Sequence, residues 1–290
     1  MVRTIESLRE RFKLRILLQV ASIPKSTYEY QVNAIHKMEE KLKELYAVMN
    51  EIFTNSNQTY GYRRMQIELK NRGYFFNRKK VRKLMKRFGF KVEQKSKRKY
   101  SSYKGEIGKV AENLINRNFL SSLPLQKLYT DITEFKLKTD VKLYFSAIVD
   151  GFNSEIVSWA ISTSPNLQLI KNTLEPLLPK LKGMKGSIMH SNQGWHYQHK
   201  YFIETLKKHN ITQSMSRKGN SPDNGLVESC FGVIKTEFFY PNRKRFDSIE
   251  QFISELNGYI WYYNNKRIKL RLKSSPVDYR NSFDSNLAQL

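Results

Sequence analysis

Three short polar segments, far apart in the chain, most constrain what it can fold into. They are LYTDITEF at 128–135, MHSNQGWHY at 189–197 and SPDNGLVESCFGVIKTE at 221–237. In the first, alternate residues face the same way along a strand, so Asp131 is directed to one face of a sheet. In the third, Ser221 and Pro222 are typical of a helix start and place Glu228 about two turns into the helix. Residues 193–227, 35 positions, separate Asn192 from Glu228, and we expect all three segments to meet in one pocket.

The apolar pattern around these segments predicts an α/β domain. Strands are expected at 128–137, 141–150 and 155–163, and their short connections indicate an antiparallel meander. Helices and strands then alternate, as they do in α/β domains. The expected helices are 166–180, 196–209, the helix carrying Glu228, and 247–264, and the expected strands are 187–191 and 211–215.

Residues 60–90 predict a helix-turn-helix unit. Gly73 ends its first helix, and Asn77 can cap a second helix with an apolar stripe that includes Val81 and Leu84. The basic residues of the second helix fall largely off this stripe, where they can face a DNA groove or its phosphates. The candidate DNA contacts in this unit are Arg63, Arg64, Arg78, Lys79, Arg82, Lys83 and Lys86.

The chain therefore divides into four parts. Residues 1–56 are helical, with a start (5–30) that fits a small DNA-binding unit and a packing collar equally well. Residues 57–90 form the helix-turn-helix domain, and 91–122 form a basic linker that lacks a folding pattern. Residues 123–285 form the α/β core, which ends in a basic segment.

The charge of the chain predicts a polyanionic partner. The formal net charge is +25, and residues 1–122 carry 28 Lys and Arg against 11 Asp and Glu. Phosphate binding relieves such an excess by releasing counterions.

No apolar run approaches the about 18 residues of a membrane span, and no signal peptide is apparent, so we expect a cytoplasmic protein without membrane contact. The single cysteine, Cys230, is interpreted as a half-buried packing residue.

With these motifs, the chain resembles the integrase-core transposases of bacterial insertion sequences, which are relatives of retroviral integrase. More narrowly, it is similar to the second-frame protein of elements whose transposase is made from two overlapping reading frames. The matching segments are YGYRRMQIELKNRGYFFNRKKVRKLMKRFGF, TDITEF, HSNQGWHYQ, SPDNGLVESCFGVIKTE and YNNKRIKLRLKSSPVDYR. The resemblance implies an α/β RNase H-like integrase core, with a mixed sheet flanked by helices, preceded by all-α helix-turn-helix units.

The resemblance also implies a catalytic site of three acids that bind two Mg²⁺ ions, for which Mn²⁺ can substitute. Asp131 is the first acid, residue 192 the second and Glu228 the third, and all three are both catalytic residues and metal ligands. Two such ions activate an oxygen nucleophile and stabilise a leaving oxygen. Here Asn192 replaces the family's aspartate, and this neutral side chain is expected to lower metal affinity and to slow the reaction by about 10³-fold.

Other residues are expected to contact DNA. Lys235, two turns after Glu228, and Arg217 and Lys218, in the loop before that helix, suit phosphate contacts. Arg267 and Lys269 match the C-terminal basic motif of the family and are expected to clamp DNA. His190 and Gln193 fit either pocket contacts or packing. Asp150 and Asp223 are alternative acids, and Trp159, Trp195 and Trp261 are interpreted as core or hinge packing residues.

The sequence thus predicts a DDE-type DNA transposase that binds terminal inverted repeats and cleaves and joins DNA strands, with no cofactor other than the metal. Expected partners are double-stranded DNA, further copies of the chain on that DNA, and a first-reading-frame product or fusion. On DNA, the protein is expected to associate with the nucleoid. Two rivals remain: a catalytically silent DNA-binding regulator, which Asn192 favours, and a nuclease for RNA–DNA hybrids, which the helix-turn-helix pattern disfavours.

Overall fold

The computed structural model describes residues 1–92, 110–184 and 186–287. The chain divides into two compact units, Met1–Glu93 and Gln94–Leu290. Within the described part of the chain, no helix combines the length and the apolar character that a membrane span requires.

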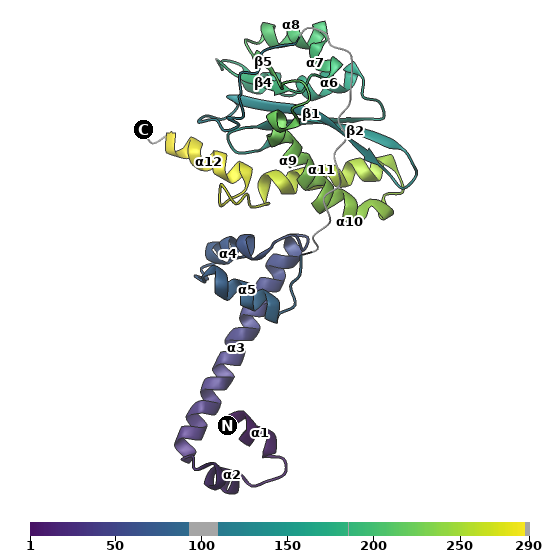
Figure 1. Cartoon of the computed structure of the whole chain (residues 1–290). Helices are drawn as coiled ribbons and strands as arrows, with labels where there is room; N and C mark the ends of the chain where they lie inside the picture. The colour runs from purple at the N-terminus through teal and green to yellow at the C-terminus, as the bar shows by residue number, and fades with distance from the viewer. Residues whose placement is uncertain (93–109, 185, 288–290) are drawn as a thin grey trace. The chain divides into compact units, whose positions relative to one another are not determined.

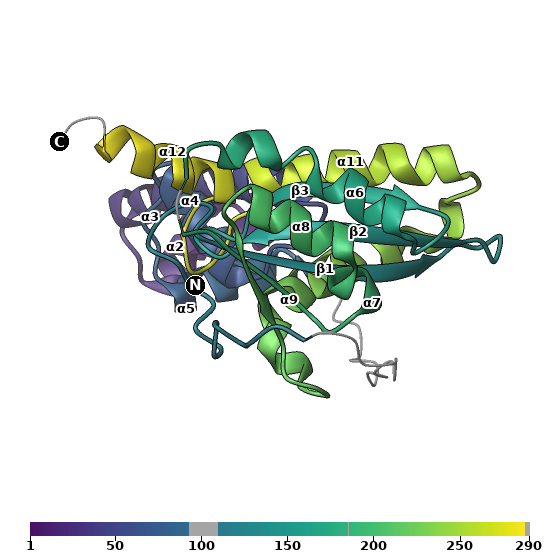
Figure 2. The same cartoon turned by 90° about the horizontal axis from the view of Figure 1, so that it is seen from above.

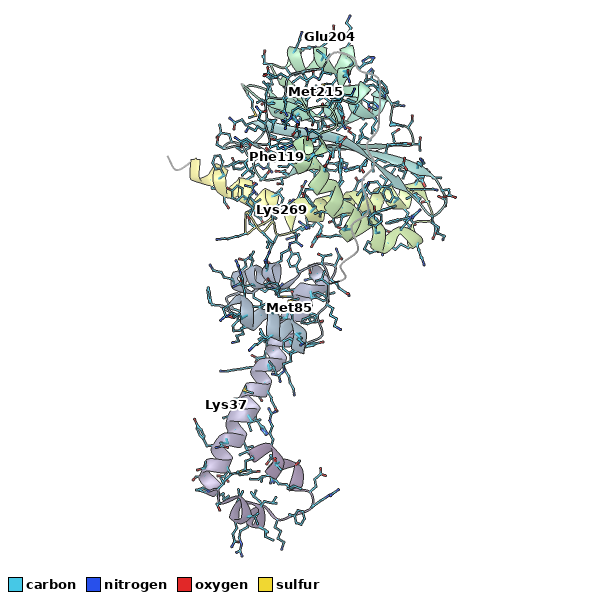
Figure 3. The ribbon with its side chains drawn as sticks, viewed as in Figure 1. Lys37, Met85, Phe119, Glu204, Met215 and Lys269 are labelled. Carbon is cyan, nitrogen blue, oxygen red and sulfur yellow. The ribbon has the colours of Figure 1, made fainter. Side chains whose placement is uncertain are left out.

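The first unit is entirely helical (Figure 1). Its helices are α1 (Val2–Leu8), α2 (Leu14–Ala21), α3 (Lys25–Asn55), α4 (Tyr62–Asn71) and α5 (Arg78–Arg87). Helix α3 buries Leu45 and Met49 at helical spacing, and α4 and α5 bury further apolar residues, among them Met85, which is labelled in Figure 3. The predicted cap of α5 is confirmed, because Asn77 Oδ1 accepts a hydrogen bond from the Lys80 backbone N–H at 2.8 Å. Gly73 follows α4 with a φ of +87°, a left-handed conformation that favours glycine.

The second unit is built on a five-stranded mixed sheet. Its strands are β1 (Lys127–Lys136), β2 (Lys142–Asp150), β3 (Ile156–Ser162), β4 (Ile188–Ser191) and β5 (Thr212–Met215), in the spatial order β3-β2-β1-β4-β5. The pairs β1–β2 and β2–β3 are antiparallel, so the predicted meander is confirmed. The pairs β1–β4 and β4–β5 are parallel, which makes the sheet mixed.

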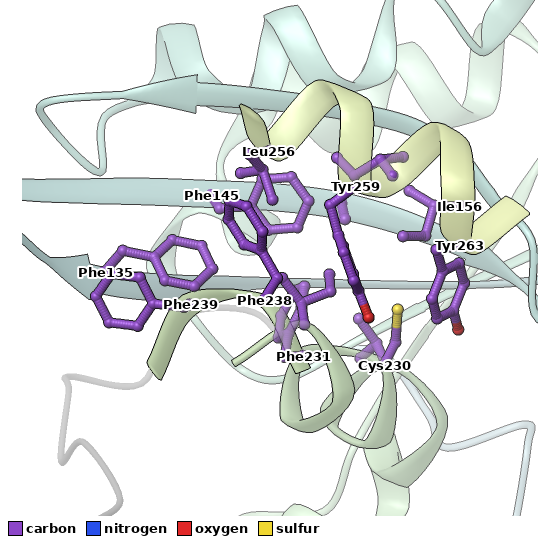
Figure 4. Close-up of a cluster of buried hydrophobic side chains, with 14 of the residues drawn as sticks. Phe135, Phe145, Ile156, Cys230, Phe231, Phe238, Phe239, Leu256, Tyr259 and Tyr263 are labelled. Carbon is purple, nitrogen blue, oxygen red and sulfur yellow. The ribbon is translucent and has the colours of Figure 1, made fainter. Parts of the chain in front are cut away.

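Helices cover both faces of this sheet (Figures 1 and 2). One face packs on α6 (Leu167–Leu174) and α8 (Lys200–Lys208), with α7 (Trp195–Gln198) beside them. The other face packs on α9 (Gly225–Val233) and α11 (Ile249–Asn265). Figure 4 shows the aromatic core of this second face, where Phe135 lies 4.9 Å from Phe239 and 6.1 Å from Phe145 between ring centroids. The predicted α/β core with a mixed sheet flanked by helices is therefore confirmed.

Three of the expected helices are interrupted. The helix expected at 166–180 ends at Leu174, because Pro176 cannot continue it, and a 3-10 turn, η1 (Leu178–Leu181), follows. The helix expected at 196–209 breaks at His199, which is extended and whose ring accepts a hydrogen bond from Tyr201 N at 3.2 Å to cap α8. The segment expected to start the Glu228 helix is a 3-10 turn, η2 (Ser221–Asn224), and α9 begins only at Gly225.

The chain after α9 also differs from the expected pattern. A π-helical segment, η3 (Ile234–Phe239), extends α9, and α10 (Tyr240–Asn242) and η4 (Arg243–Arg245) lead to α11. Beyond α11 the sequence predicted only a basic segment, whereas the structure adds α12 (Pro276–Leu287). The hydroxyl of Ser275 accepts a hydrogen bond from Asp278 N at 3.2 Å and so caps this helix.

Residues 110–122, which we name the strap, belong to the core and not to the predicted 91–122 linker. The rest of that linker, at 93–109, lies outside the described residues. Leu114 N donates a hydrogen bond to Ser214 Oγ at 3.0 Å, and Met215 N donates to the Glu112 carbonyl at 3.3 Å. Ile115 is 2% exposed within the aromatic core. The strap was missed because its contacts join residues about a hundred positions apart and follow no local periodicity.

Substituting Gly151 with alanine is expected to lower the free energy of unfolding by about 1–3 kcal/mol, because neighbouring atoms already occupy the space that a Cβ would need. A Cβ at Gly151 would lie 2.5 Å from the carbonyl oxygen of Phe119 in the strap and 3.1 Å from the carbonyl oxygen of Lys127. Gly258, inside α11, has nothing within 4 Å of an added Cβ, so Gly258→Ala is expected to stabilise by about 0.5–1 kcal/mol. Urea unfolding of both variants tests this contrast, and equal effects would contradict the packing of the strap against Gly151.

Candidate catalytic site

Strand β1 directs Asp131 toward helix α9. Side chains two residues apart on a strand share a face, and both Tyr129 and Phe135 lie in the core that β1 forms with α9 and α11. Asp131 shares their parity and therefore their face. The half-buried carboxylate also accepts a hydrogen bond from the Ile132 backbone N–H at 2.8 Å, which fixes its orientation.

The register of β1 and β4 brings residue 192 beside Asp131. The two strands pair in parallel, and the last pair of the ladder is Tyr129 with His190. The same offset, continued by two residues, sets Asn192 opposite Asp131. Asn192 comes one residue after the end of β4, outside the ladder, and its Nδ2 donates a hydrogen bond to Asp131 Oδ1 at 2.6 Å.

The amide of Asn192 is oriented by partners on both sides. Its Oδ1 accepts a hydrogen bond from Gly194 N at 2.8 Å, while its NH₂ group faces the Asp131 carboxylate. The opposite assignment of the amide atoms would place two acceptors against each other at Asp131 and two donors against each other at Gly194. Asn192 therefore presents donors to the site, and its oxygen is directed away from Asp131.

Helix α9 supplies the second carboxylate, that of Glu228. Its start is anchored to β1, because Asn224 Nδ2 donates a hydrogen bond to the Thr130 carbonyl at 3.1 Å, and Asn224 is 1% exposed. Glu228 is half-buried one turn later, close enough that its charge raises the pKa of Asp131. The structure thus joins residues 131 and 192 by a hydrogen bond and places the Glu228 carboxylate within electrostatic range of Asp131.

Burial controls the electrostatics of the site. It raises the pKa of Asp131 to about 7, with a further increase from the charge of Glu228, against the opposing hydrogen bonds from Ile132 and Asn192. Burial also raises the pKa of Glu228. Lys235 is half-buried, and burial lowers its pKa although the charges of Glu134 and Asp131 oppose that shift. Surroundings that disfavour an isolated carboxylate charge favour the binding of a cation beside it.

The donor set fits a hard divalent cation only in part. Asp131 and Glu228 offer carboxylate oxygens, the ligands that Mg²⁺ prefers. In the described ranges, no group of three or more His, Cys, Asp and Glu side chains could hold a metal ion. The amide at 192 contributes neither a charge nor, in this orientation, an oxygen to such a group.

The two alternative acids have structural partners. Asp150 is 1% exposed and accepts hydrogen bonds from Leu125 N at 2.8 Å and Phe152 N at 2.9 Å. Asp223 is fully buried and accepts from Arg217 Nε at 2.8 Å and Arg117 Nε at 2.9 Å. These guanidinium groups, Arg217 first, hold the pKa of Asp223 well below its usual range.

The other candidate residues near the site differ in exposure. Lys218 is exposed, and the Arg217 side chain is about half exposed although it pairs with Asp223. His190 is fully buried between Ser214 Oγ at 2.9 Å and Ser216 Oγ at 3.1 Å, and burial lowers its pKa to about 4. Gln193 Nε2 donates to the Ser216 carbonyl at 3.0 Å. For His190, packing is therefore the better of the two interpretations.

The structure contradicts the assignment of Arg267 to DNA. Its guanidinium is 1% exposed and forms two hydrogen bonds of 2.6 Å with the carboxylate of Glu237. A side chain bonded in the interior cannot clamp an external strand. Lys269 is half-buried, with its Nζ 4.5 Å from the centroid of the Tyr263 ring. The sequence prediction was wrong because the composition of the basic run at 264–273 suggests a solvated segment. Nothing in that run indicates that Glu237, 30 residues away, pairs with Arg267.

The candidate DNA contacts of the first unit lie on its surface. Arg63 is exposed, and Arg64 is half-buried with its guanidinium 5.7 Å from the Tyr60 ring centroid. On α5 the exposed cations are Arg78, Lys79, Lys80, Arg82, Lys83, Lys86 and Arg87. Only Lys80 and Arg87 were not predicted as contacts.

Sequence reasoning also missed residues that support the site. Arg117 and Asn113 of the strap bond to Asp223, the latter through Nδ2 at 3.1 Å. Asn224 joins α9 to β1. The position of Asn224 beside Asp223 in SPDNG was the sequence feature that could have identified it. Nothing in the sequence near Arg117 indicates its distant partner.

Family models match most of the chain. An integrase core domain matches residues 121–221, a second integrase core domain model matches 228–283, and an HTH-like domain matches 39–100. The InsK protein of insertion sequence element IS150 from Escherichia coli is 38% identical over 97% of this chain and 98% of its own. An uncharacterized transposase-like protein of Haemophilus influenzae is 45% identical over 70% of this chain and 93% of its own. Transposase InsF for insertion sequence IS3A of Escherichia coli is 32% identical, with coverages of 80% and 82%.

Among solved structures, the HTLV-2 integrase catalytic core domain in complex with magnesium matches this chain with 19% identity and a TM-score of 0.41. The match covers 55% of this chain and 98% of the HTLV-2 chain. Because that score lies below 0.5, the class of the protein rests on strand order and the family models. These define an RNase H-like integrase core preceded by a helix-turn-helix-like domain. The chain belongs to the family of insertion-sequence transposases, of the two-reading-frame type that the sequence predicted.

Proposed function

We propose that this chain is a DNA transposase whose integrase core cleaves the ends of its element and joins them to a target strand, and that Asn192 depresses this activity. The observation that supports the proposal is the hydrogen bond between Asn192 and Asp131 beside β1, with the charge of Glu228 on α9 acting on Asp131. Hydrogen bonds link β1 to the segment after β4 and to the turn before α9, in a chain with a net charge of +25.

In this proposal Asp131 and Glu228 hold a divalent cation, and the Ile132 N–H keeps the Asp131 carboxylate in place. A bound pair of Mg²⁺ ions, or Mn²⁺ in their place, supplies activation of an oxygen nucleophile and stabilisation of the leaving oxygen. Lys235 offers its ammonium group to a phosphate beside Asp131, and Lys218 and Arg217 offer theirs from the loop before α9. Two copies of the chain hold the two element ends, together with a first-frame product or fusion.

A second candidate function is that of a silent regulator that occupies element ends. The observation in its favour is the contact of the Asn192 NH₂ group with Asp131, which offers a donor where a cation needs an acceptor. Such a protein binds DNA through its first unit and performs no chemistry.

One assay separates the two candidates. The chain and its Asn192→Asp variant are incubated with labelled terminal-repeat DNA and Mg²⁺ or Mn²⁺, and binding, nicking and joined products are scored separately. The transposase proposal expects both forms to bind and the variant to nick and join. Binding without any product from the variant would favour the regulator, and no binding by either form would reject both.

Substituting Lys79 and Arg82 together with alanine is expected to weaken binding to terminal-repeat DNA. Both side chains are exposed on α5, and the loss of two phosphate contacts should reduce the slope of log affinity against log salt by about 2. Lys37→Ala with Lys41→Ala removes the same charge from exposed positions on α3 and serves as the matched control. Equal slopes for the two double variants would contradict the assignment of α5 as the DNA-facing helix.

A further inference from the structure

Trp195 is an exposed aromatic side chain in a tightly held part of the core. Its relative exposure is 51%, which contradicts its interpretation as a packing residue. The next two side chains, His196 and Tyr197, are 9% and 1% exposed. The indole is therefore the part of this segment that projects into solvent. Its exposure forgoes the stabilisation that burial of an apolar ring would give the fold.

Hydrogen bonds fix the segment on either side of Trp195. Gln193 Nε2 donates to the Ser216 carbonyl at 3.0 Å, and Gln213 Nε2 donates to the Tyr197 carbonyl at 2.6 Å. His196 Nε2 hydrogen-bonds to the Pro165 carbonyl. These bonds tie residues 193–197 to β5, to the residue that follows β5 and to the loop before α6. Because the segment is already ordered, a ligand that binds it loses little free energy to the ordering of the protein.

The indole is supported on one face. It stacks on the His196 ring with the centroids 4.0 Å apart and an interplanar angle of 28°. Because His196 is itself buried and hydrogen-bonded, the stack is already formed without a ligand. A flat ring held in this way presents its other face to a further planar group.

Trp195 lies at the edge of the candidate catalytic site. It is three positions after Asn192 in the chain, which limits the distance between their Cα atoms to about 11 Å. Gly194 N, adjacent to Trp195, is bonded to Asn192 Oδ1 at 2.8 Å. Gln193 also bonds to the residue that precedes Arg217 and Lys218. An aromatic face next to exposed cations is the combination that binds unpaired nucleotides.

We propose that Trp195 stacks an unpaired base next to the phosphodiester at the Asp131–Glu228 site, so that the chain prefers terminal DNA whose end is open. This inference rests on the proposed function. Opening a terminal pair costs free energy that stacking on Trp195 offsets. A terminal duplex with unpaired nucleotides beside the reacting phosphate needs no opening and is therefore bound more tightly than a fully paired one.

The test compares two terminal-repeat duplexes, one fully paired and one with three mismatched nucleotides at the reacting end, each with 2-aminopurine beside the scissile phosphate. The unaltered chain and Trp195→Phe are expected to prefer the open end and to quench the 2-aminopurine fluorescence. Trp195→Ala is expected to lose about 5- to 150-fold in affinity for the open end, the range for base–aromatic stacking. Trp261→Ala, which removes an indole that is 58% exposed on α11, is the matched control and should change neither property.

The outcomes distinguish this inference from the proposed function. If all variants bind both duplexes equally, the stacking role is wrong while DNA binding stands. If the unaltered chain binds neither duplex, both are wrong. A change in sedimentation of Trp195→Ala, with quenching and affinity unchanged, would instead assign the indole to a contact between copies of the chain and overturn the inference.

Discussion

Substituting Asn192 with aspartate is expected to raise the rate of Mg²⁺-dependent cleavage and joining of terminal-repeat DNA by about 10³-fold. The variant replaces an NH₂ group, 2.6 Å from Asp131 Oδ1, by a charged oxygen. In the proposed site, three carboxylates are then available to the cation. Single-turnover rates on labelled DNA measure the gain, and Asn192→Asp combined with Glu228→Gln serves as the control that should remove it.

The same substitution should make the melting temperature depend on metal. Without a cation, the new carboxylate faces Asp131 at hydrogen-bond distance, and repulsion between like charges destabilises the core. Mg²⁺ that binds only the folded state restores stability by mass action. Thermal melting with and without Mg²⁺ should therefore show a larger shift for the variant than for the unaltered chain. A shift of equal size in both would contradict the assignment of residue 192 to the metal site.

Substituting Arg267 with methionine is expected to lower the free energy of unfolding of the second unit by about 3–5 kcal/mol, because it removes the cationic partner of the half-buried Glu237 carboxylate. Arg267 bonds to both oxygens of Glu237 at 2.6 Å, and Tyr259 donates a third hydrogen bond to that carboxylate at 3.1 Å. Denaturant unfolding, followed by the fluorescence of the three tryptophans, which all lie in the second unit, measures the loss.

The matched control is the double variant Arg267→Met with Glu237→Gln. Removing both charges also removes the cost of burying them, so this variant should regain most of the lost stability. Lys244→Ala, at an exposed position in η4, should change stability by less than about 0.5 kcal/mol. A stable Arg267→Met protein with weakened DNA binding would instead restore the predicted role of Arg267 as a DNA clamp.

The parts of the fold that local pattern determines were predictable from the sequence. Alternation in TDITEF sets the face of Asp131, and turn residues between short apolar runs give the meander of β1, β2 and β3. The cap at Asn77 follows from its side-chain chemistry. These features depend on neighbours within a few residues, which is the range over which periodicity and capping act.

Features that depend on distant partners could not be predicted. The strap reaches Asp223 and Ser214 through side chains such as Arg117, and the bond between Arg267 and Glu237 converts an apparently exposed cation into an interior residue. Trp195 was misassigned because large aromatic residues usually pack inside, and only the structure shows which face is left uncovered. Helix α12 was an avoidable omission, since Ser275-Pro276 is a standard helix start.

The placement of residue 192 just beyond the last β1–β4 pair has a genetic consequence. Asparagine and aspartate codons differ only in their first base, and a side chain outside the strand ladder can be exchanged without disturbing the pleat. A transition from adenine to guanine is then enough to turn the neutral site into an acidic one. Copies with either residue are one mutational step apart, so under the proposed role of residue 192 a population of them would lose and regain mobility while the architecture of the protein persists.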